Sequence, residues 1–167
     1  YVRLARESLT VYLESGKELR GLPGYVTEEM KNTRRGVFVS LKKHGELRGC
    51  IGTIMPTTES VAWEIVRNAI EAGLNDPRFD SVEPEELDDI TFSVDVLTEP
   101  EPARREDLDP KKYGVIVSSG YRRGLLLPDL DGVESVDAQL SIALRKAGIS
   151  PAEDYKIERF RVIRHRE

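Results

Sequence analysis

Two glycines flank a cysteine inside a stretch that otherwise has the pattern of a β-strand. The heptapeptide Leu47–Thr53 has the sequence LRGCIGT and holds the only cysteine of the 167 residues. Glycine inside a strand weakens it and usually marks a bulge or a close approach of another backbone or a ligand. Arg48 lies two positions before Cys50, so in a regular strand both side chains leave the same face. The heptapeptide therefore predicts a tightly packed strand with a thiol and a cation side by side.

Hydrophobic periodicity predicts three helices and six strands. Apolar residues recur at helical spacing in three segments, each followed by glycine: 2–15, 59–72 and 136–147. They alternate or run together in six short segments that we predict as strands: 36–41, 47–54, 90–97, 113–117, 124–127 and 157–163. Turns at 43–46, with Gly45 at a positive φ, and at 118–123 join four of these strands into two hairpins. Residues 164–167 are expected to form a polar tail.

This mixture of hairpins and helices predicts an α+β domain with a mixed, mostly antiparallel sheet and flanking helices. The length favours a single domain over residues 1–167, with two closely packed lobes as the alternative. Residues 99–110 are rich in proline and charge and are expected to form an exposed loop. Because the sequence begins at Tyr1 rather than Met, a fragment of a longer chain is one interpretation.

Composition argues against several classes of function. Twenty-five basic and 30 acidic residues give a net charge of −5, whereas nucleic-acid-binding domains usually carry a basic excess. No apolar run approaches the ~20 residues of a bilayer span, so no membrane segment is expected. A single cysteine permits no internal disulfide, which suits a reducing, cytoplasmic setting. His44 and His165 lie far apart and no CxxC is present, so we predict no transition-metal site and no cofactor.

Several ordered segments resemble the AMMECR-type domain family. The RGCIG motif, residues 48–52, has the pattern of the family signature, and further segments match in order: 35–39 (RGVFV), 68–69 (NA), 76–79 (DPRF), 93–97 (SVDVL), 122–128 (RRGLLLP) and 158–160 (ERF). The resemblance covers nearly the whole chain. It implies an α+β fold with two unequal lobes, for which the loop near 99–112 is the expected boundary. It implies no settled activity.

The resemblance also suggests partners. In many prokaryotes such a domain is encoded beside, or fused to, a Memo-like protein and a radical S-adenosylmethionine (radical SAM) enzyme. These two proteins are therefore candidate partners of this chain. The family supplies a motif rather than a mechanism, so it assigns no catalytic residue.

Cys50 is the candidate catalytic residue, as a nucleophile or a covalent acceptor. A free thiol titrates near ~8.5, so it needs a cation or a base to react at neutral pH. Arg48 is the candidate cation. As a base, His44 is disfavoured because it lies in the predicted turn more than about 10 Å from Cys50, and His165 requires the last strand to lie alongside. The favoured alternative is a small thiol buried in a strand.

Glycine and arginine residues are the candidate ligand-binding groups. Gly49 and Gly52 either expose N–H groups that receive a phosphate or carboxylate beside Arg48, or let another element pack tightly against the strand. Arg122 and Arg123 lie in the predicted turn of the second hairpin, where guanidinium groups suit anion recognition. The favoured alternative for this pair is a solvated turn.

Two loop and strand carboxylates complete the candidates. Asp76 and Arg78 flank Pro77 and either bind a ligand or pair with each other, and we favour the pairing. Asp95 is an acid in an apolar strand, on the face opposite its apolar neighbours. It is a candidate general base, or simply a polar residue on the solvent face.

Two functions of different classes follow. The leading hypothesis is a pocket around the RGCIG motif that binds a small anionic molecule or a modified peptide, with or without catalysis. The alternative is a non-catalytic interaction module that acts with a Memo-like or radical SAM partner. Its motivation is that the sequence shows no catalytic dyad, triad or metal set.

Overall fold

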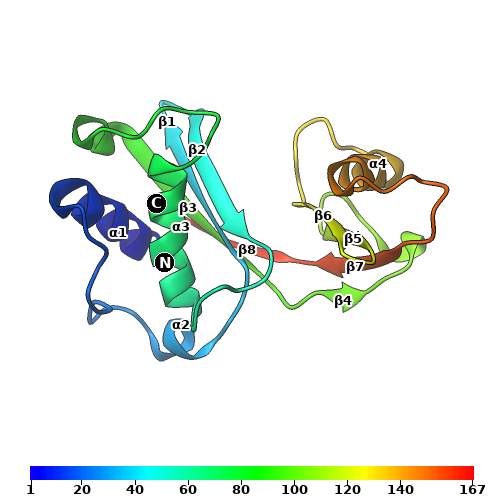
Figure 1. Ribbon diagram of the computed structural model, residues 1–167, viewed down its shortest axis with the longest axis horizontal. Coiled ribbons are helices and arrows are strands. Elements are labelled where there is room, and N and C mark those ends of the chain that lie inside the picture. The colour runs from blue at the N-terminus through cyan, green and yellow to red at the C-terminus, as the bar shows by residue number, and fades with distance from the viewer. The chain divides into compact units, whose positions relative to one another are not determined.

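The structure, a computed structural model, describes residues 1–167 and divides the chain into two units (Figure 1). Unit 1 comprises Tyr1–Val96 and Ile163–Glu167, and unit 2 comprises Leu97–Val162. The first division lies ahead of the expected boundary at 99–112. Each unit combines helix with a four-stranded sheet, so the predicted α+β class is confirmed.

Unit 1 is a sheet with helices packed on one face. Its helices are α1 (Val2–Ser15), α2 (Glu28–Asn32) and α3 (Val61–Leu74), with a 3-10 turn η1 (Pro84–Asp89), and its strands are β1 (Val37–Lys43), β2 (Glu46–Thr53), β3 (Ile90–Leu97) and β8 (Val162–Arg166). The strand order is β2-β1-β3-β8, which makes β2 an edge strand. Alternate apolar residues of β1 and β3 join those of α1 and α3 in one core, among them Val39, Phe92, Leu9 and Ile65. The opposite face of β1 therefore carries Phe38 and Ser40.

Unit 2 has a smaller sheet and one long helix. Its elements are β4 (Glu101–Pro102), a 3-10 turn η2 (Arg105–Asp107), β5 (Gly114–Ser119), β6 (Arg122–Leu126), α4 (Val136–Ala147) and β7 (Lys156–Phe160). The strand order is β4-β7-β5-β6, and all pairs are antiparallel. Apolar residues of α4 pack against one face of this sheet, with Val115, Val117, Leu140 and Leu144 in the core.

Helix and hairpin predictions are largely confirmed. Helices expected at 2–15 and 136–147 occur at those residues, and the one expected at 59–72 spans 61–74 because the Ser60 side chain caps its N-terminus. The first hairpin turns at His44 and Gly45, whose φ angles of 52° and 81° are those of a two-residue turn.

Two strand predictions are wrong. The second hairpin turns at Gly120 and Tyr121, so Arg122 and Arg123 lie within β6 rather than in the turn. Gly120 supplies the positive φ that shortens this turn. The expected strand at 157–163 is interrupted at Arg161, and its two parts, β7 and β8, belong to different sheets. Most of the expected polar tail, 164–167, is therefore strand.

The glycines of the RGCIG motif allow close packing around β2. A Cβ on Gly49 would lie 2.2 Å from the carbonyl oxygen of Ala72, so the backbone of α3 approaches this strand directly. A Cβ on Gly52 would lie 2.2 Å from Cγ of Phe38, whose ring occupies that space on the neighbouring strand. Both glycines thus have a packing role, which is one of the two interpretations of the sequence.

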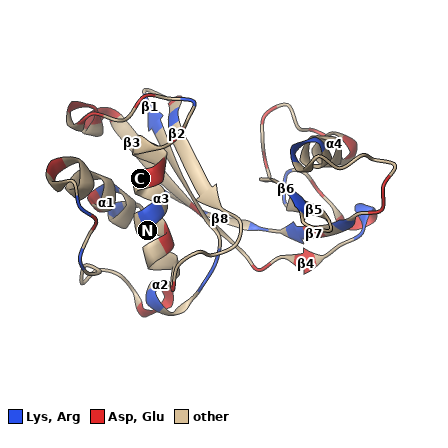
Figure 2. Cartoon of the chain, in the orientation of Figure 1, with Lys and Arg blue, Asp and Glu red and all other residues tan.

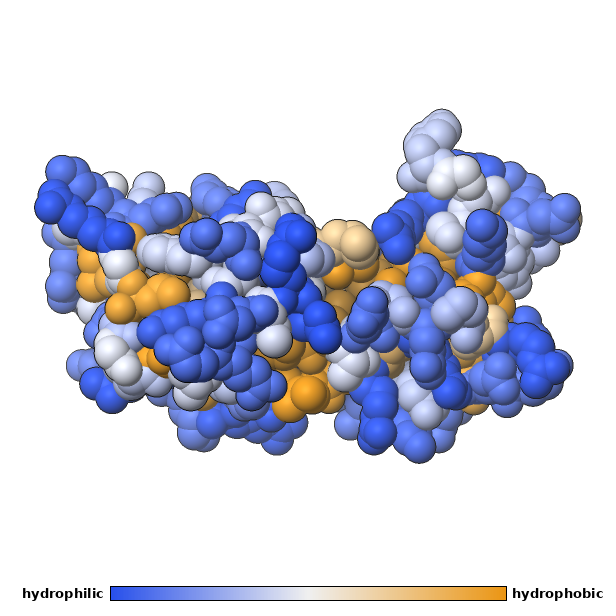
Figure 3. All heavy atoms as spheres, turned by 90° about the horizontal axis from the view of Figure 1, so that it is seen from below, coloured by the Kyte–Doolittle hydropathy of each residue, from blue (hydrophilic) through white to orange (hydrophobic).

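Hydrophilic residues predominate on the face of the molecule drawn in Figure 3, and apolar areas lie between them. Four large apolar side chains are exposed: Leu47, Met55, Tyr121 and Ile163. No helix combines the length and the apolar character needed to cross a membrane.

Replacing Gly49 tests the close approach of α3. Gly49→Ala forces a methyl group against the Ala72 carbonyl, a backbone group that cannot rotate away. We expect the free energy of unfolding, measured by urea denaturation, to fall by about 2 kcal/mol. Gly24→Ala is the matched control, because a Cβ there meets nothing within 4 Å. Equal stability of the two variants would contradict the packing role.

Candidate functional site

Three short polar side chains form a row across the unit 1 sheet, on the face that α1 and α3 do not cover. Ser40 of β1 lies opposite Cys50 of β2 on one side and opposite Ser93 of β3 on the other. Ser40 Oγ and Cys50 Sγ are 3.2 Å apart, and all three residues are half-buried. We call Cys50, Ser40 and Ser93 the polar row.

A second set of residues borders the polar row. Phe38 lies opposite Gly52 and Asp95 in the neighbouring strands. Asp95 is only 4% exposed, and both of its carboxylate oxygens accept bonds from the Arg164 guanidinium, at 2.7 and 2.9 Å. The expectation that Asp95 faces solvent is therefore wrong, because a strand-to-strand ion pair covers it. A carboxylate held at both oxygens is poorly placed to act as a general base.

Asp76 and Arg78 pair with each other, as the sequence analysis favours. Arg78 donates from Nη2 to Asp76 Oδ2 at 2.8 Å and from Nε to Oδ1 at 3.0 Å. The backbone N–H of Cys50 also donates to Asp76 Oδ2, at 3.0 Å. Mainly because of Arg78, the pKa of Asp76 lies well below its usual range. The carboxylate therefore stays charged and blocks part of the exposed edge of β2.

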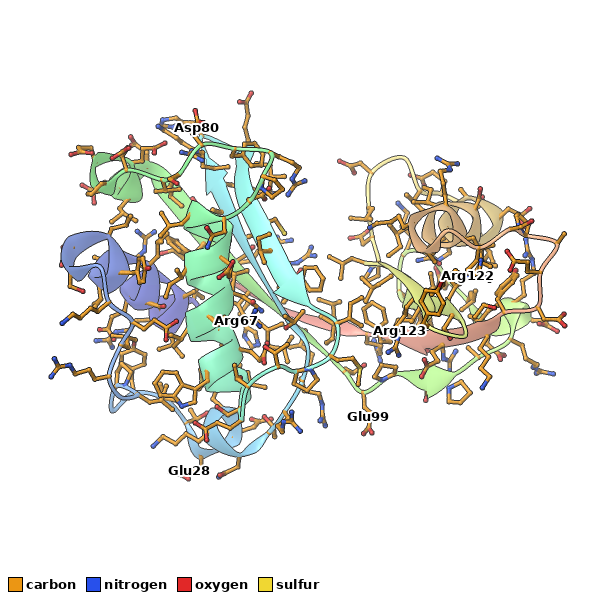
Figure 4. All side chains as sticks on the ribbon, in the orientation of Figure 1. Glu28, Arg67, Asp80, Glu99, Arg122 and Arg123 are labelled. Carbon is orange, nitrogen blue, oxygen red and sulfur yellow. The ribbon has the colours of Figure 1, made fainter.

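Arg48 binds residues that follow α3 and makes no hydrogen bond to the thiol. Its Nε and Nη2 donate to the two carboxylate oxygens of Glu86, at 3.0 and 3.1 Å, and Nη1 donates to the Asp80 carbonyl at 2.7 Å. Asp80, labelled in Figure 4, lies in the loop that follows α3. Arg48 is also the extra residue of a β-bulge, since Lys42 pairs with Leu47 while the residue before it pairs with position 49. The bulge interrupts the alternation that placed Arg48 beside the thiol.

Arg78 is the cation whose charge acts on the Cys50 thiol. Its Nη2 lies 3.4 Å from the Cys50 carbonyl oxygen, and its side chain is 56% exposed. Burial nevertheless raises the pKa of the Cys50 thiol, and the bond to Ser40 and the charge of Arg78 offset only part of that rise. The thiol is therefore mainly neutral at pH 7 and a weak nucleophile.

Neither histidine can act as a base for Cys50. His44 lies in the β1–β2 turn, as the sequence predicts. His165 lies on β8, and two strands separate β8 from β2, a distance of about 14 Å at the usual strand spacing. Its ring stacks on Tyr1, with centroids 3.7 Å apart. The geometry supplies hydrogen-bond donors around the thiol but no proton acceptor of the usual kind.

Arg122 and Arg123 belong to unit 2, on β6. Arg122 pairs with Glu153 and donates to the Gly148 carbonyl at 2.9 Å. Arg123 Nη2 lies 3.4 Å from Glu158 Oε1.

Among residues that the sequence analysis missed, Ser40 and Ser93 had a usable signal, because they occupy the polar positions of strands in which polar and apolar residues alternate. Arg164 had none, because it lies in a segment expected to be a tail.

The arrangement suits hydrogen bonding to a ligand better than metal binding. No group of three or more histidine, cysteine, aspartate or glutamate side chains is placed to hold a metal ion. The polar row presents one thiol and two hydroxyl groups within one half-buried patch. Such groups donate to an oxygen-rich ligand without adding a negative charge.

Glu86 should make the stability of unit 1 pH-dependent. Its pKa is lowered to about 2, chiefly by Arg48, so its stabilising effect is complete above about pH 4.5 and is lost as the pH falls toward 2. We expect Glu86→Gln to remove up to about 3 kcal/mol at pH 7 and to flatten the acid limb of the stability profile. Glu85→Gln, on the same turn but exposed, is the control for urea unfolding between pH 2 and 7. An unchanged acid limb would contradict the role of this pair.

Comparison with known proteins identifies the family. A protein of Clostridium acetobutylicum is 66% identical over 167 residues, but the chain spans only 36% of that relative's length. A protein of Thermotoga maritima is 51% identical over 99% of this chain and 97% of its own. The crystal structure of the uncharacterized protein PH0010 from Pyrococcus horikoshii matches with a TM-score of 0.87 and 30% identity, over 99% of this chain and 94% of that one. Since the AMMECR1 family model also matches residues 2–165, the chain belongs to the AMMECR1 family.

Proposed function

We propose that the chain is a binding protein whose polar row receives an anionic oxygen group of a small molecule or of a modified peptide. The observation that carries this proposal is the alignment of Cys50, Ser40 and Ser93 across three neighbouring strands. All three side chains are short, and none of them is fully buried. One donor is used between Ser40 and Cys50, which leaves at least two donors of the row for a ligand, and hydrogen-bond donors favour an anion.

The surroundings of the polar row support the same proposal. The Arg78 guanidinium is more than half exposed, and its Nη1 takes part in none of its bonds to Asp76 and Cys50. It can therefore donate to a ligand while Asp76 fixes its position. The Phe38 ring occupies the space beside Gly52 and gives the site an apolar border. A ligand with an anionic group next to an apolar portion fits this combination.

Within this proposal the thiol is a hydrogen-bond donor and not a nucleophile. Burial raises the pKa of Cys50, and neither histidine lies within reach of its sulfur. A donor role requires the protonated thiol, which is the form that burial favours. It also requires that the thiol stays reduced, so we place the protein in the cytoplasm.

An interaction module is the second candidate. The segment that matches this chain makes up 36% of the Clostridium relative, so a similar domain occurs there beside a larger amount of other polypeptide. We propose a Memo-like protein and a radical SAM enzyme as the partners to test. Size-exclusion chromatography of purified mixtures should give co-elution if the module binds either protein directly. Separate elution of all components at micromolar concentration would count against this candidate.

Alkylation separates the donor from the nucleophile. Because Cys50 is the only cysteine, iodoacetamide labelling followed by mass spectrometry reports on one site. We expect the native protein at pH 7 to label more slowly than the urea-unfolded chain, with a rate that rises only at higher pH than for a free thiol. Labelling that is as fast in the native state at pH 7 would favour nucleophilic catalysis instead.

Removing hydroxyl groups tests the polar row. We expect inorganic phosphate to shift the NMR amide signals of Ser40 and Cys50, and Ser93→Ala to weaken binding roughly fivefold, the value of a hydrogen bond of about 1 kcal/mol. Thr91→Ala is the matched control, since it removes a hydroxyl from the same face of β3 outside the row. Cys50→Ser keeps a donor and should retain binding. Equal loss in the Ser93 and Thr91 variants, or no shift in the wild type, would overturn the proposal.

A further inference from the structure

Unit 2 contains an open groove that the proposed site in unit 1 does not use. Its volume is about 830 Å³, within the range of sites that bind ligands. The lining comes from β4, β7 and the β5–β6 hairpin with residues next to them, and its charged and aromatic members are Tyr121, Arg123, Tyr155, Lys156 and Glu158. We call it the unit 2 groove. All of its residues lie between 97 and 162, so it is complete within one unit.

Arg123 faces this groove, whereas its neighbour Arg122 does not. Gly124 lies against the Ala143 carbonyl of α4, where a Cβ would be 2.3 Å from that oxygen. By strand alternation Arg122 shares the α4 side, and its guanidinium donates to the Gly148 carbonyl at the end of that helix. Arg123 lies on the opposite face and lines the groove. Figure 4 labels both arginines on β6.

The groove presents more positive charge than negative charge to a ligand. Lys156 is exposed and makes no ion pair, and Arg123 makes a single bond of 3.4 Å to Glu158. The Nε and Nη1 donors of Arg123 take no part in that bond. A second carboxylate can therefore accept a hydrogen bond from Nε or from Nη1 of Arg123 while Lys156 adds a long-range attraction. Basic residues of β6 and β7 are drawn blue in Figure 2.

Tyrosine rings give the groove the composition of a protein interface. Tyr121 is 96% exposed and lies on the tight turn of the β5–β6 hairpin, beside Gly120 with its positive φ. Tyr155 lines the groove immediately before β7. Tyrosine and arginine are enriched among residues that dominate protein–protein binding, since they offer large contact areas together with hydrogen bonds. An aromatic ring held in solvent on a short turn is already placed for such a contact.

We propose that the unit 2 groove binds an acidic segment of a partner protein, with Arg123 and Lys156 contacting its carboxylates and Tyr121 and Tyr155 contacting its apolar atoms. The charge of the groove favours an acidic over a basic segment. Glu158 competes with the segment for Arg123, so it limits affinity. This interaction is independent of the polar row in unit 1, because no residue of the groove belongs to that unit.

Peptide selection tests the proposal on the full chain. The immobilised protein is used to select from a phage-displayed library of random heptapeptides, in parallel with its Arg123→Ala variant. We expect the wild type to enrich sequences that contain aspartate or glutamate, and the variant to lose this enrichment. No enrichment, enrichment of basic sequences, or equal enrichment on both proteins would overturn the proposal.

Affinities of one selected peptide then define the contacts. By fluorescence polarisation we expect Arg123→Ala to weaken binding roughly tenfold or more, as for residues that dominate interfaces. Glu158→Gln should strengthen binding, because it removes the competing carboxylate. Arg122→Gln is the matched control for loss of a cation on the same strand and should leave affinity unchanged, with circular dichroism confirming that each variant is folded. Weakening by Glu158→Gln, or equal effects of both arginine variants, would contradict the assigned geometry.

Discussion

The direct approach of the α3 backbone to Gly49 determines much of the structure around β2. A Cβ at that position would lie 2.2 Å from the Ala72 carbonyl, so the helix can reach the edge strand only where the side chain is absent. Because Ala72 lies near the end of α3, the loop that follows begins beside the edge of the sheet. The Asp76 carboxylate can then accept the Cys50 N–H, and the carbonyl of Asp80 can accept from Arg48. The absence of a side chain at Gly49 therefore allows residues far apart in sequence to come into contact.

The chemistry of the RGCIG motif follows from this packing. Arg48 binds Glu86, Gly49 lies against the backbone of α3, and Gly52 lies against the ring of Phe38. Most of the motif therefore supports the fold. The Cys50 side chain points to the face of the sheet that α1 and α3 do not cover, where it forms a hydrogen bond with Ser40. Burial of the thiol also raises its pKa and so favours the protonated form.

Local features of the sequence predicted most of the fold. Helix ends at Gly16 and Gly148 and the turn at Gly45 could be predicted because each depends on a few neighbouring residues. The break at Arg161 could not, since both halves have strand character and only pairing with separate sheets distinguishes them. The turn at Gly120 was placed too broadly because Arg123 has a polar side chain inside a strand.

The candidate site was predicted less completely than the fold. Cys50 and the Asp76–Arg78 pair were found from local sequence, and the pair was given its observed arrangement. The role of Arg48 was misplaced, because a bulge reverses the alternation of side chains and no local pattern marks it. Ser40 and Ser93 join Cys50 only through cross-strand register, which a single sequence does not reveal.

The order of the units along the chain has a consequence for synthesis. Unit 2 is one continuous segment inserted into unit 1, whose last strand comes from residues after 162. The ion pair of Asp95 with Arg164 and the bond from the Phe92 amide to the Glu167 carboxylate can form only after residues 164–167 have been synthesised. On the ribosome, proteins usually complete their N-terminal domain first. Here the later segment can close its own core while unit 1 still lacks an edge strand, so unit 1 is completed after unit 2.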